Sequence, residues 1–352
     1  NAMNPCFLNL LWIALQVQVA RSFQPAYEVV NRTHNQLSAS GFETNVPVQV
    51  ATPNEMSTGG SVTNDCEASD GHDGKDVIAF SSSFLSGTTG KHPRTASRTA
   101  LVILNYRIPN KSLLLEHLWK TSSTRIAADG GANRLYEYSK ELIPDRIRGD
   151  LDSLDPTVRA YYESQNVSVE QDFCQNSNDL DKALQVLVEE NKNADDDNHE
   201  TPSPSPSFDR VVIYGAFGGR FDQEMASFVA LYKWAPRFNG QMYLYSDETC
   251  AFLIPAQKEC EIFLPFYDTQ APDSVDGNNV PHEIREGPTC GLIPLGCPCE
   301  SIVTSGLQWD LDGSIPLEFG GLVSTSNRVM KPIVKIFASH PVVFTAELVS
   351  KR

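Results

Sequence analysis

Apolar and polar positions along the middle of the chain change period from about two to about 3.6 and back again. Residues 99–105 (TALVILN) are a short aliphatic run typical of a buried strand, and residues 110–122 place leucines and a tryptophan at helical spacing. The same change recurs up to residues 178–190, which form the clearest amphipathic helix. This alternation predicts a mostly parallel sheet with helices on its faces.

Two polar stretches divide the rest of the pattern. Residues 191–207 are charged and rich in Ser and Pro, and they have no apolar period that could pack. The alternation resumes at residue 209, but after residue 246 short strands and turns replace the helical signals, with a second polar stretch at residues 268–286. We therefore expect a Rossmann-like parallel α/β domain over residues 98–246, followed by an all-β sandwich domain over residues 247–352.

The first 97 residues show a different pattern. Asn1 and Ala2 precede Met3 and are expected to be a cloning remnant. Residues 7–20 are strongly apolar but too short and too interrupted to span a bilayer. They lack the basic start of a signal peptide although their length fits its apolar part; a docking helix or a wrongly assigned first exon are the alternatives. Residues 22–97 are polar and without period, so residues 1–97 are expected to be disordered or loosely attached and dispensable for activity.

Charge and cysteine content narrow the class of protein. Lys and Arg number 28 against 44 Asp and Glu, a formal charge of −16, which argues against binding to the nucleic-acid backbone. The chain is not expected to insert stably into a membrane. The cysteines are too dilute for a disulfide scaffold, and no pair has the C-x-x-C spacing of a structural zinc site, so we expect reduced thiols in a cytoplasmic protein. They are Cys6, Cys66, Cys174, Cys250, Cys260, Cys290, Cys297 and Cys299.

Four loops that follow predicted strands are unusually rich in carboxylates and glycines. They are ADGGAN (residues 128–133), GDLDSL (149–154), QNSNDLD (175–181) and GAFGGRFDQ (215–223). Because the carboxyl ends of parallel strands meet at one edge of a sheet, all four loops are expected to lie together. That edge would carry one fixed cation, Arg220, and the carboxylates of Asp129, Asp150, Asp152, Asp179, Asp181 and Asp222.

So many carboxylates repel one another in a partly buried cleft unless a cation lies between them. Magnesium prefers hard oxygen ligands and is usually bound by one or two carboxylates together with substrate phosphates. Arg220 offers a planar fork for phosphate oxygens, and the Gly130–Gly131 and Gly218–Gly219 turns allow a nucleotide close to backbone N–H groups. The pattern thus predicts a magnesium–phosphate site. Singly, each motif has a plainer explanation: a solvated Asp-x-Asp turn, or helix N-caps at Asp129, Asn178 or Asp179.

Six motifs carry a resemblance to a known family. AADGGANRLY, RGDLDSL, NDLDKAL, GAFGGRFDQEMAS, GLQWDL and GLVSTSN occur in this order, and residues 99–344 resemble the eukaryotic thiamine pyrophosphokinases. The resemblance implies Mg²⁺-dependent transfer of pyrophosphate from ATP to the hydroxyl of thiamine, giving thiamine diphosphate and AMP. It also implies a homodimer with the active site at the subunit interface. The alternatives are another nucleotide-dependent transferase and an inactive thiamine-binding or regulatory protein on the same fold.

The resemblance also assigns residues to roles. It implies catalytic roles for Asp150, Asp152, Asp179, Arg220 and Asp222, of which the first three would also be metal ligands. It implies nucleotide contacts for Asp129, Gly130, Gly131, Asn133, Asn178, Lys182, Gly219 and Gln223. Trp309 would stack on the thiamine pyrimidine, with Ser324, Ser326 and Asn327 beside it. Asn178 and Asp181 stand where many relatives have Thr, and Asp181 adds a carboxylate whose role the resemblance does not supply.

Overall fold

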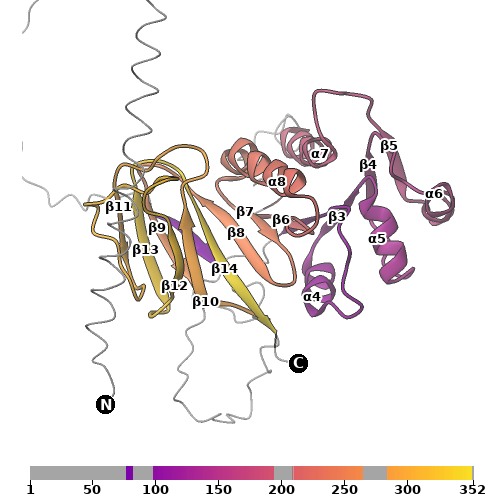
Figure 1. The fold of residues 1–352 in the computed structure, drawn as a ribbon. Coiled ribbons are helices and arrows are strands. Elements are labelled where there is room, and N and C mark those ends of the chain that lie inside the picture. The colour runs from indigo at the N-terminus through magenta and orange to yellow at the C-terminus, as the bar shows by residue number, and fades with distance from the viewer. Residues whose placement is uncertain (1–76, 82–97, 194–207, 209, 265–283, 351–352) are drawn as a thin grey trace, which may run out of the picture. The chain divides into compact units, whose positions relative to one another are not determined.

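The computed structural model describes residues 77–81, 98–193, 208, 210–264 and 284–350. Six strands form the parallel part of the larger sheet in the spatial order β7-β6-β2-β3-β4-β5. They are β2 (Thr99–Ile103), β3 (Thr124–Ala128), β4 (Arg146–Gly149), β5 (Ser168–Gln171), β6 (Arg210–Tyr214) and β7 (Met242–Tyr245). This arrangement confirms the predicted parallel α/β domain (Figure 1).

Five helices connect these strands and cover both faces of the sheet. They are α4 (Leu113–Thr121), α5 (Gly131–Tyr138), α6 (Pro156–Ser164), α7 (Asp179–Asn193) and α8 (Phe221–Trp234), the last followed by the short helix η1 (Ala235–Phe238). Their ends follow the sequence: Ser112 caps α4 by accepting a hydrogen bond from the Leu115 amide, and Asp155 caps α6 ahead of a proline.

Alternation along the strands decides which helices lie on which face. On β2, Leu101 and Ile103 belong to the same buried cluster as the apolar side chains of α4, α5 and α6. Their neighbours Ala100 and Val102 belong to the cluster that includes the apolar side chains of α7 and α8. Because successive side chains of a strand point to opposite faces, a strand that is buried throughout needs helices on both sides.

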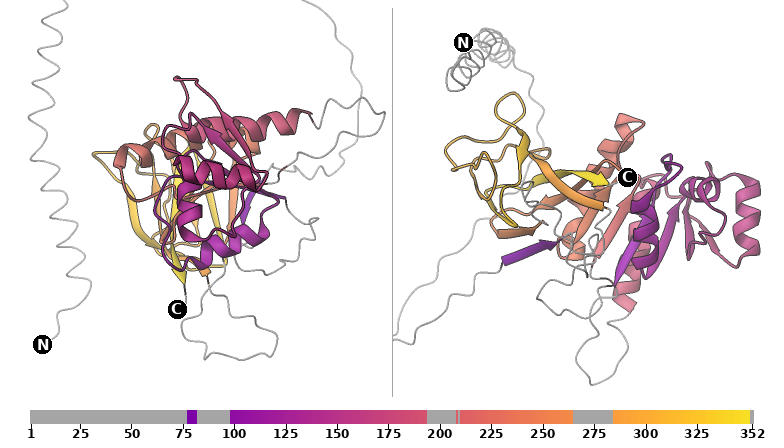
Figure 2. Two further views of the ribbon diagram at one scale, coloured as in Figure 1. Left: turned by 90° about the vertical axis from the view of Figure 1, so that its right-hand side faces the viewer. Right: turned by 90° about the horizontal axis from the view of Figure 1, so that it is seen from below.

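The C-terminal part is made of antiparallel strands and confirms the predicted β-rich domain. Four strands extend the large sheet and three more belong to a second, four-stranded sheet. They are β8 (Thr249–Ile254), β9 (Glu259–Phe263), β10 (Ile284–Ile293), β11 (Ile302–Ser305), β12 (Ser324–Arg328), β13 (Ile333–Ala338) and β14 (Val342–Ser350). Figure 2 shows these orange and yellow strands gathered at one end of the molecule and the α/β elements at the other.

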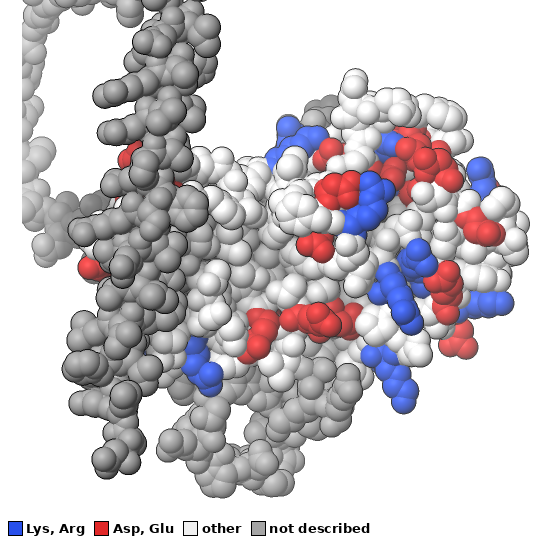
Figure 3. Space-filling view, viewed as in Figure 1, with Lys and Arg blue, Asp and Glu red and all other residues white. Residues whose placement is uncertain are grey.

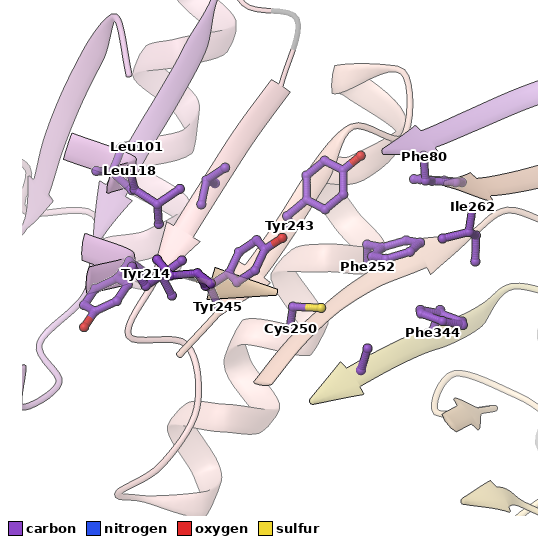
Figure 4. Close-up of a cluster of buried hydrophobic side chains, with 14 of the residues drawn as sticks. Phe80, Leu101, Leu118, Tyr214, Tyr243, Tyr245, Cys250, Phe252, Ile262 and Phe344 are labelled. Atoms are coloured by element: carbon purple, nitrogen blue, oxygen red, sulfur yellow. The ribbon is translucent and has the colours of Figure 1, made fainter. Parts of the chain in front are cut away.

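One continuous sheet joins the two parts. The last parallel strand, β7, pairs antiparallel with β8, so the large sheet has ten strands and runs from β12 to β5 without a break. Figure 4 shows the buried side chains along this junction, from Leu101 and Tyr214 through Tyr245 to Phe252 and Phe344. The predicted boundary at residues 246 and 247 falls in the β7–β8 turn, and the hydrogen bonds across β7 and β8 hold the two parts together.

A short strand lies in the segment for which the sequence predicted loose attachment. β1 (Val77–Ser81) pairs in parallel with β9 at the edge of the four-stranded sheet, and its indigo arrow lies among the orange and yellow strands (Figures 1 and 2). Phe80 is 1% exposed, and its ring stacks on that of Phe252 with 4.7 Å between centroids. For these five residues the prediction was wrong; the rest of the leader, residues 1–76 and 82–97, lies outside the described residues.

The second polar stretch ends earlier than the sequence predicted. Residues 284–286, the last three of the predicted insertion at 268–286, are the first residues of β10 and pair with β14. Glu286 is buried, and its carboxylate accepts a hydrogen bond from the Tyr245 hydroxyl. The start of this strand was missed because Glu286 is charged, and its hydrogen-bond partner Tyr245 lies far away in the sequence. None of the helices in the described part of the chain is long and apolar enough to cross a membrane.

We expect Phe80→Ala to lower the free energy of unfolding by about 3–5 kcal/mol, because the change removes a fully packed ring from the junction of the two sheets. Val77→Ala in the same strand is the matched control: Val77 is 45% exposed, so the change should cost no more than about 0.5 kcal/mol. Urea denaturation of both variants measures the difference. Equal stabilities would show that β1 does not pack as described.

Candidate active site

The loops after β3 and β4 and the start of α7 bring the predicted carboxylates together. Asp129 directly follows β3, Asp150 directly follows β4, and Asp179 is the first residue of α7. Carboxylate oxygens of Asp129, Asp150 and Asp152 all lie within 4.8 Å of one another. The carboxyl ends of the parallel strands therefore form an acidic cluster, as the sequence predicted, with Asp129 as one of its three members.

Asp129 is the most deeply buried member of the cluster. It is 3% exposed and has φ 41°, a left-handed conformation that is uncommon for residues other than glycine. Its amide donates to the Arg148 carbonyl at 3.0 Å, and its Oδ2 accepts from the Ser153 amide at 3.2 Å. Burial, followed by the nearby Asp179 charge, raises the pKa of the Asp129 carboxyl.

Asp150 and Asp152 are fixed by a tight turn. The Asp152 amide donates to Asp150 Oδ1 at 3.2 Å, and Leu151 between them has φ 64°. Asn133 fastens this turn to α5: its Nδ2 donates to the Ser153 carbonyl at 2.7 Å, and its Oδ1 accepts from the Asp155 amide at 3.0 Å. The Asn133 amide, assigned by the resemblance to the nucleotide, is thus engaged in building the acidic loop.

A buried lysine supplies the positive charge beside the cluster. Lys182 is 2% exposed, and its Nζ lies 3.3 Å from both Asp150 Oδ2 and Asp179 Oδ1. Asp179 Oδ1 also accepts from the Asp150 amide at 3.2 Å. Asp179 is therefore occupied by protein partners and is not in the three-carboxylate cluster, whereas the resemblance makes it a metal ligand.

These contacts shift the pKa values of both partners. Burial raises the pKa of the Asp150 carboxyl, but the Asp152 amide and the Lys182 ammonium outweigh it, so the pKa lies below its usual value. Burial likewise disfavours the Lys182 ammonium, but Asp179 and Asp150 outweigh it and the pKa is raised. Both groups are charged at neutral pH, and the pair holds the β4 loop against α7.

Further charges near this edge are paired. On the face in Figure 3, Asp and Glu side chains gather over the α/β elements, with Lys and Arg beside them. Arg148, near the end of β4, lies 2.9 Å from Asp172, whereas Arg146 at the start of the strand lies 2.6 Å from Glu190 of α7. Arg148 thus balances part of the acidic charge at the end of β4 that carries the cluster.

The glycine turn before α5 brings the backbone close to β2. Gly130 is the N-cap of α5, and a Cβ on Gly131 would lie 2.3 Å from the Ile103 carbonyl oxygen. Glycine is required there because the helix begins against the end of β2. The amides at this helix start face the same edge of the sheet as the cluster, where a helix N-terminus favours phosphate.

The loop after β6 carries the remaining predicted catalytic residues. Gly218 and Gly219 both have positive φ, and Arg220 caps α8. The Arg220 guanidinium lies 2.5 Å from Asp222 through Nη2 and 3.0 Å through Nε, and this two-point ion pair is exposed. Among the described residues, no hydrogen bond or ion pair links Arg220 or Asp222 to the acidic cluster. Gln223 is exposed one residue further on.

Two polar residues at the start of α7, Asn178 just before the helix and Asp181 in its first turn, have roles within the fold. Asn178 accepts the Asp181 amide at 2.8 Å, the pattern of a helix N-cap. Asp181 accepts from the Trp234 indole at 2.5 Å and lies 3.1 Å from Lys233 Nζ, which ties α7 to α8. The N-cap alternative thus accounts for the Asn178 side chain, and Asp181 stabilises helix packing.

The predicted thiamine residues lie in the β-rich part. Trp309 is 57% exposed, whereas Asn327 is 2% exposed. Asn327 uses its whole amide within the fold: Oδ1 accepts from the Trp309 and Arg328 amides, and Nδ2 donates to the Trp309 carbonyl and Ser324 Oγ. Asn327 therefore positions the Trp309 backbone. Ser326 is exposed, with φ 55°.

The acidic cluster contains a residue that the sequence analysis placed with the nucleotide. Asp129 was expected to contact the nucleotide and to leave the metal to Asp150, Asp152 and Asp179. The sequence did contain a signal for a place in the cluster, because Asp129 directly follows a predicted strand just as Asp150 does. Ser153, whose amide holds Asp129, was missed altogether, because backbone donors leave no pattern in a sequence.

The fold is that of an α/β protein with an acidic cluster at the carboxyl ends of its parallel strands, the edge at which open α/β sheets bind their ligands. Residues 115–244 match the family model described as thiamin pyrophosphokinase, catalytic domain, and residues 278–343 match that of the vitamin B1 binding domain. The chain is 33% identical over 292 residues to thiamine pyrophosphokinase 1 of Oryza sativa subsp. japonica, which covers 77% of this chain and 98% of the relative. The chain belongs to the thiamine pyrophosphokinase family.

Further relatives agree with this assignment. Thiamine pyrophosphokinase 2 of Arabidopsis thaliana is 31% identical over 290 residues, covering 78% of this chain and 94% of the relative. Among solved structures, yeast thiamin pyrophosphokinase superposes with a TM-score of 0.61 at 24% identity, covering 79% of this chain and 94% of the other. The Candida albicans enzyme gives 0.58 at 24% identity, covering 78% and 93%. These two structures support the fold.

We expect Lys182→Met to destabilise the protein, because it leaves Asp150 and Asp179 facing each other without their shared cation. The loss should be smaller than the roughly 3–5 kcal/mol of a fully buried pair, since both carboxylates remain partly solvated. Lys233→Met is the control: it removes a half-exposed ion pair with Asp181 and should cost at most about 1 kcal/mol. Chemical denaturation measures both, and a Lys182→Met variant as stable as the control would contradict the role of Lys182.

Proposed function

We propose that the chain is a thiamine diphosphokinase, which transfers a pyrophosphoryl group from ATP to the hydroxyl of thiamine and releases thiamine diphosphate and AMP. The observation that carries the proposal is the cluster of Asp129, Asp150 and Asp152, three carboxylates within 4.8 Å at the ligand-binding edge of a fold matched by this family. The exposed aromatic ring of Trp309 in the matched vitamin B1 binding region supports thiamine as the acceptor.

The acidic cluster fits a magnesium ion. Three oxygen donors lie close together, and a buried oxygen of Asp129 has no protein partner. Asp150 and Asp152 are the residues we assign to the ion, and Asp179 would join them only by releasing part of its contact with Lys182. Bound magnesium would neutralise the charge of the ATP phosphates.

The protein groups around the cluster position the reactants. Lys182 holds Asp150 in place, and we assign the amides at the start of α5 to the phosphates of ATP. Arg220 is exposed and presents a guanidinium fork that we assign to phosphate oxygens, with Asp222 orienting it. Phosphoryl transfer depends chiefly on positioning and charge, so a protein nucleophile is not needed. Asp152, the more exposed of the two turn carboxylates, is the group we assign to receive the thiamine hydroxyl proton.

Thiamine carries a fixed positive charge, which an aromatic face attracts. We assign the pyrimidine to the Trp309 ring, beside Ser324 and Ser326, with residues 247–352 as the thiamine-binding domain. The same part of the chain exposes Ile315, Phe319 and Leu322. Exposed apolar side chains of this kind suit contact with a second copy of the chain, so we propose a homodimer whose active site combines the acidic cluster of one subunit with Trp309 of the other.

We place the enzyme in the cytoplasm. The six cysteines in the described part of the chain are all free thiols, in keeping with a reducing compartment: Cys174, Cys250, Cys260, Cys290, Cys297 and Cys299.

Asp150→Asn and Asp222→Asn should each lower AMP release by roughly 10²–10³-fold or more while the fold survives, because they remove charge but keep volume. AMP release with thiamine and ATP, with and without Mg²⁺, measures this. Asp145→Asn is the control: Asp145 precedes β4, at the opposite end of the strand from Asp150, is exposed, and should retain activity. Undiminished turnover in Asp150→Asn would rule out the assignment. A wild-type chain that binds thiamine but releases no AMP would identify an inactive binding protein.

A mixing experiment tests the shared active site. Asp150→Asn and Trp309→Ala subunits should each be nearly inactive at limiting thiamine, but mixed dimers contain one site in which both residues are intact. After subunit exchange at equal amounts, activity should recover to about a quarter of the wild-type value. Activity that stays at the level of the separate variants would place the whole site within one subunit.

A further inference from the structure

The loop after β2 lies between two of the four loops that the sequence analysis singled out, but it was not one of them. β2 pairs with β3 on one side and with β6 on the other. The chain goes from β2 to β3 and returns on the opposite side at β6, so the direction of the strand order changes beside β2. Open α/β sheets bind ligands at such a point. Residues 104–112, which we call the β2 loop, therefore stand where a ligand is expected.

The side chain of Tyr106 in the β2 loop packs along the loop that follows β6. A Cβ at Gly215 would lie 3.1 Å from Tyr106 Cβ, and one at Gly218 only 2.3 Å from the Tyr106 hydroxyl oxygen. A Cβ at Gly219 would lie 3.4 Å from the edge of the same ring. The three glycines have φ of 85°, 86° and 89°, which side chains rarely adopt. The loop after β6 thus follows the shape of one aromatic side chain.

The β2 loop that carries Tyr106 is itself fixed at several points. The Leu104 amide donates to the Tyr214 carbonyl at 2.9 Å, and the Tyr106 amide donates to the Leu104 carbonyl at 2.8 Å. Asn105 Oδ1 accepts from Arg134 Nε of α5 at 2.9 Å. These bonds tie the β2 loop to β6 and to α5, so the Tyr106 ring has a defined position.

Arg220 depends on this packing because little else holds it. In the part of the chain that the structure describes, its side chain is hydrogen-bonded to Asp222 alone, and both are exposed. Two contacts hold the Gly218–Gly219 turn just before it: the Tyr106 ring, and a hydrogen bond of 2.7 Å from the Gly218 amide to Glu224 Oε1. The turn sets the direction in which the Arg220 side chain leaves the loop.

We propose that Tyr106 is a positioning residue for Arg220, whose ring holds the turn from which the guanidinium reaches the phosphate oxygens of ATP. The proposal rests on the proposed function, which assigns Arg220 to these oxygens. The Tyr106 hydroxyl makes no hydrogen bond with the described residues, so the volume of the ring and not its polar group has this role. Correct placement of a binding group lowers the free-energy cost of bringing the reactants together.

Calorimetric titration of the full-length chain with ATP and Mg²⁺, without thiamine, tests the proposal. We expect Tyr106→Ala to raise the dissociation constant for ATP about tenfold or more, and Tyr106→Phe, which keeps the ring, to stay within about twofold of wild type. Tyr161→Ala is the matched control: Tyr161 is a half-buried tyrosine of α6 whose hydroxyl donates to the Lys140 carbonyl, and its loss should leave ATP affinity within about twofold. Wild-type affinity in Tyr106→Ala, or an equal loss in Tyr161→Ala, would overturn the proposal.

A double-mutant cycle tests whether Tyr106 acts through Arg220. Arg220→Ala should weaken ATP binding by itself, and adding Tyr106→Ala to it should change the dissociation constant by no more than about twofold. A purely structural role of the ring would not depend on Arg220. The full tenfold effect of Tyr106→Ala in the Arg220→Ala background would therefore overturn the proposal.

Gly218→Ala covers the case in which Tyr106→Ala does not fold. The added methyl group would force the turn away from the Tyr106 ring, so ATP affinity should fall as in Tyr106→Ala. Gly240→Ala is the control: Gly240 also has a positive φ, 79°, but a Cβ there would lie no closer than 3.8 Å to Phe80. Unchanged ATP affinity in Gly218→Ala, or an equal loss in Gly240→Ala, would contradict the role of the contact.

The outcomes separate this proposal from the proposed function. A wild-type chain that binds ATP with these dependences but releases no AMP with thiamine keeps the role of Tyr106 and loses the kinase. AMP release by wild type with ATP binding that is indifferent to Tyr106→Ala keeps the kinase and overturns the role of Tyr106. A wild-type chain that binds no ATP overturns both.

Discussion

The ammonium of Lys182 holds the acidic edge of the sheet together. It lies 3.3 Å from carboxylates that belong to two loops, Asp150 after β4 and Asp179 at the start of α7, and it is almost fully buried. Without it, like charges would push these loops apart. One positive charge cannot balance the whole cluster, and the remaining negative charge is what the proposed function assigns to a divalent ion.

The second constraint is the continuity of the large sheet. Because β7 pairs with β8, the β-rich part is joined to the α/β part by main-chain hydrogen bonds as well as by its linking peptide. A polar network next to this junction adds to it: Ser112 Oγ donates to Asp247 at 2.5 Å, and the Tyr214 hydroxyl donates to the same carboxylate. Trp309, whose backbone is held by Asn327 on β12, and the acidic cluster after β3 and β4 therefore belong to one continuous sheet.

Most of the fold could be predicted from local pattern. The strands β2, β6 and β7 are short, mostly apolar runs flanked by turn residues, and α4 and α7 have clear helical periodicity, so their physical signal lies within a few residues. β1 was missed because five residues beside polar sequence are too few for a pattern, and it is Phe252, far along the chain, that makes Phe80 a core residue. The start of β10 was missed because Glu286 is charged, and the Tyr245 hydroxyl that makes its burial possible is distant in sequence.

The sequence by itself determined which residue types meet at the ligand-binding edge, because parallel strands must place their following loops side by side. It also determined the family, through motifs that keep their order. Only the tertiary structure decided the role of each polar side chain. Hydrogen bonds within the fold engage the side-chain amides of Asn133, Asn178 and Asn327. Asp181 links two helices, whereas one buried oxygen of Asp129 has no hydrogen-bond partner in the protein. The physical reason is that a hydrogen bond depends on which groups lie close together in space. The sequence gives only the residue type, which is the same whether the partner of a carboxylate or an amide is a ligand or the protein's own backbone.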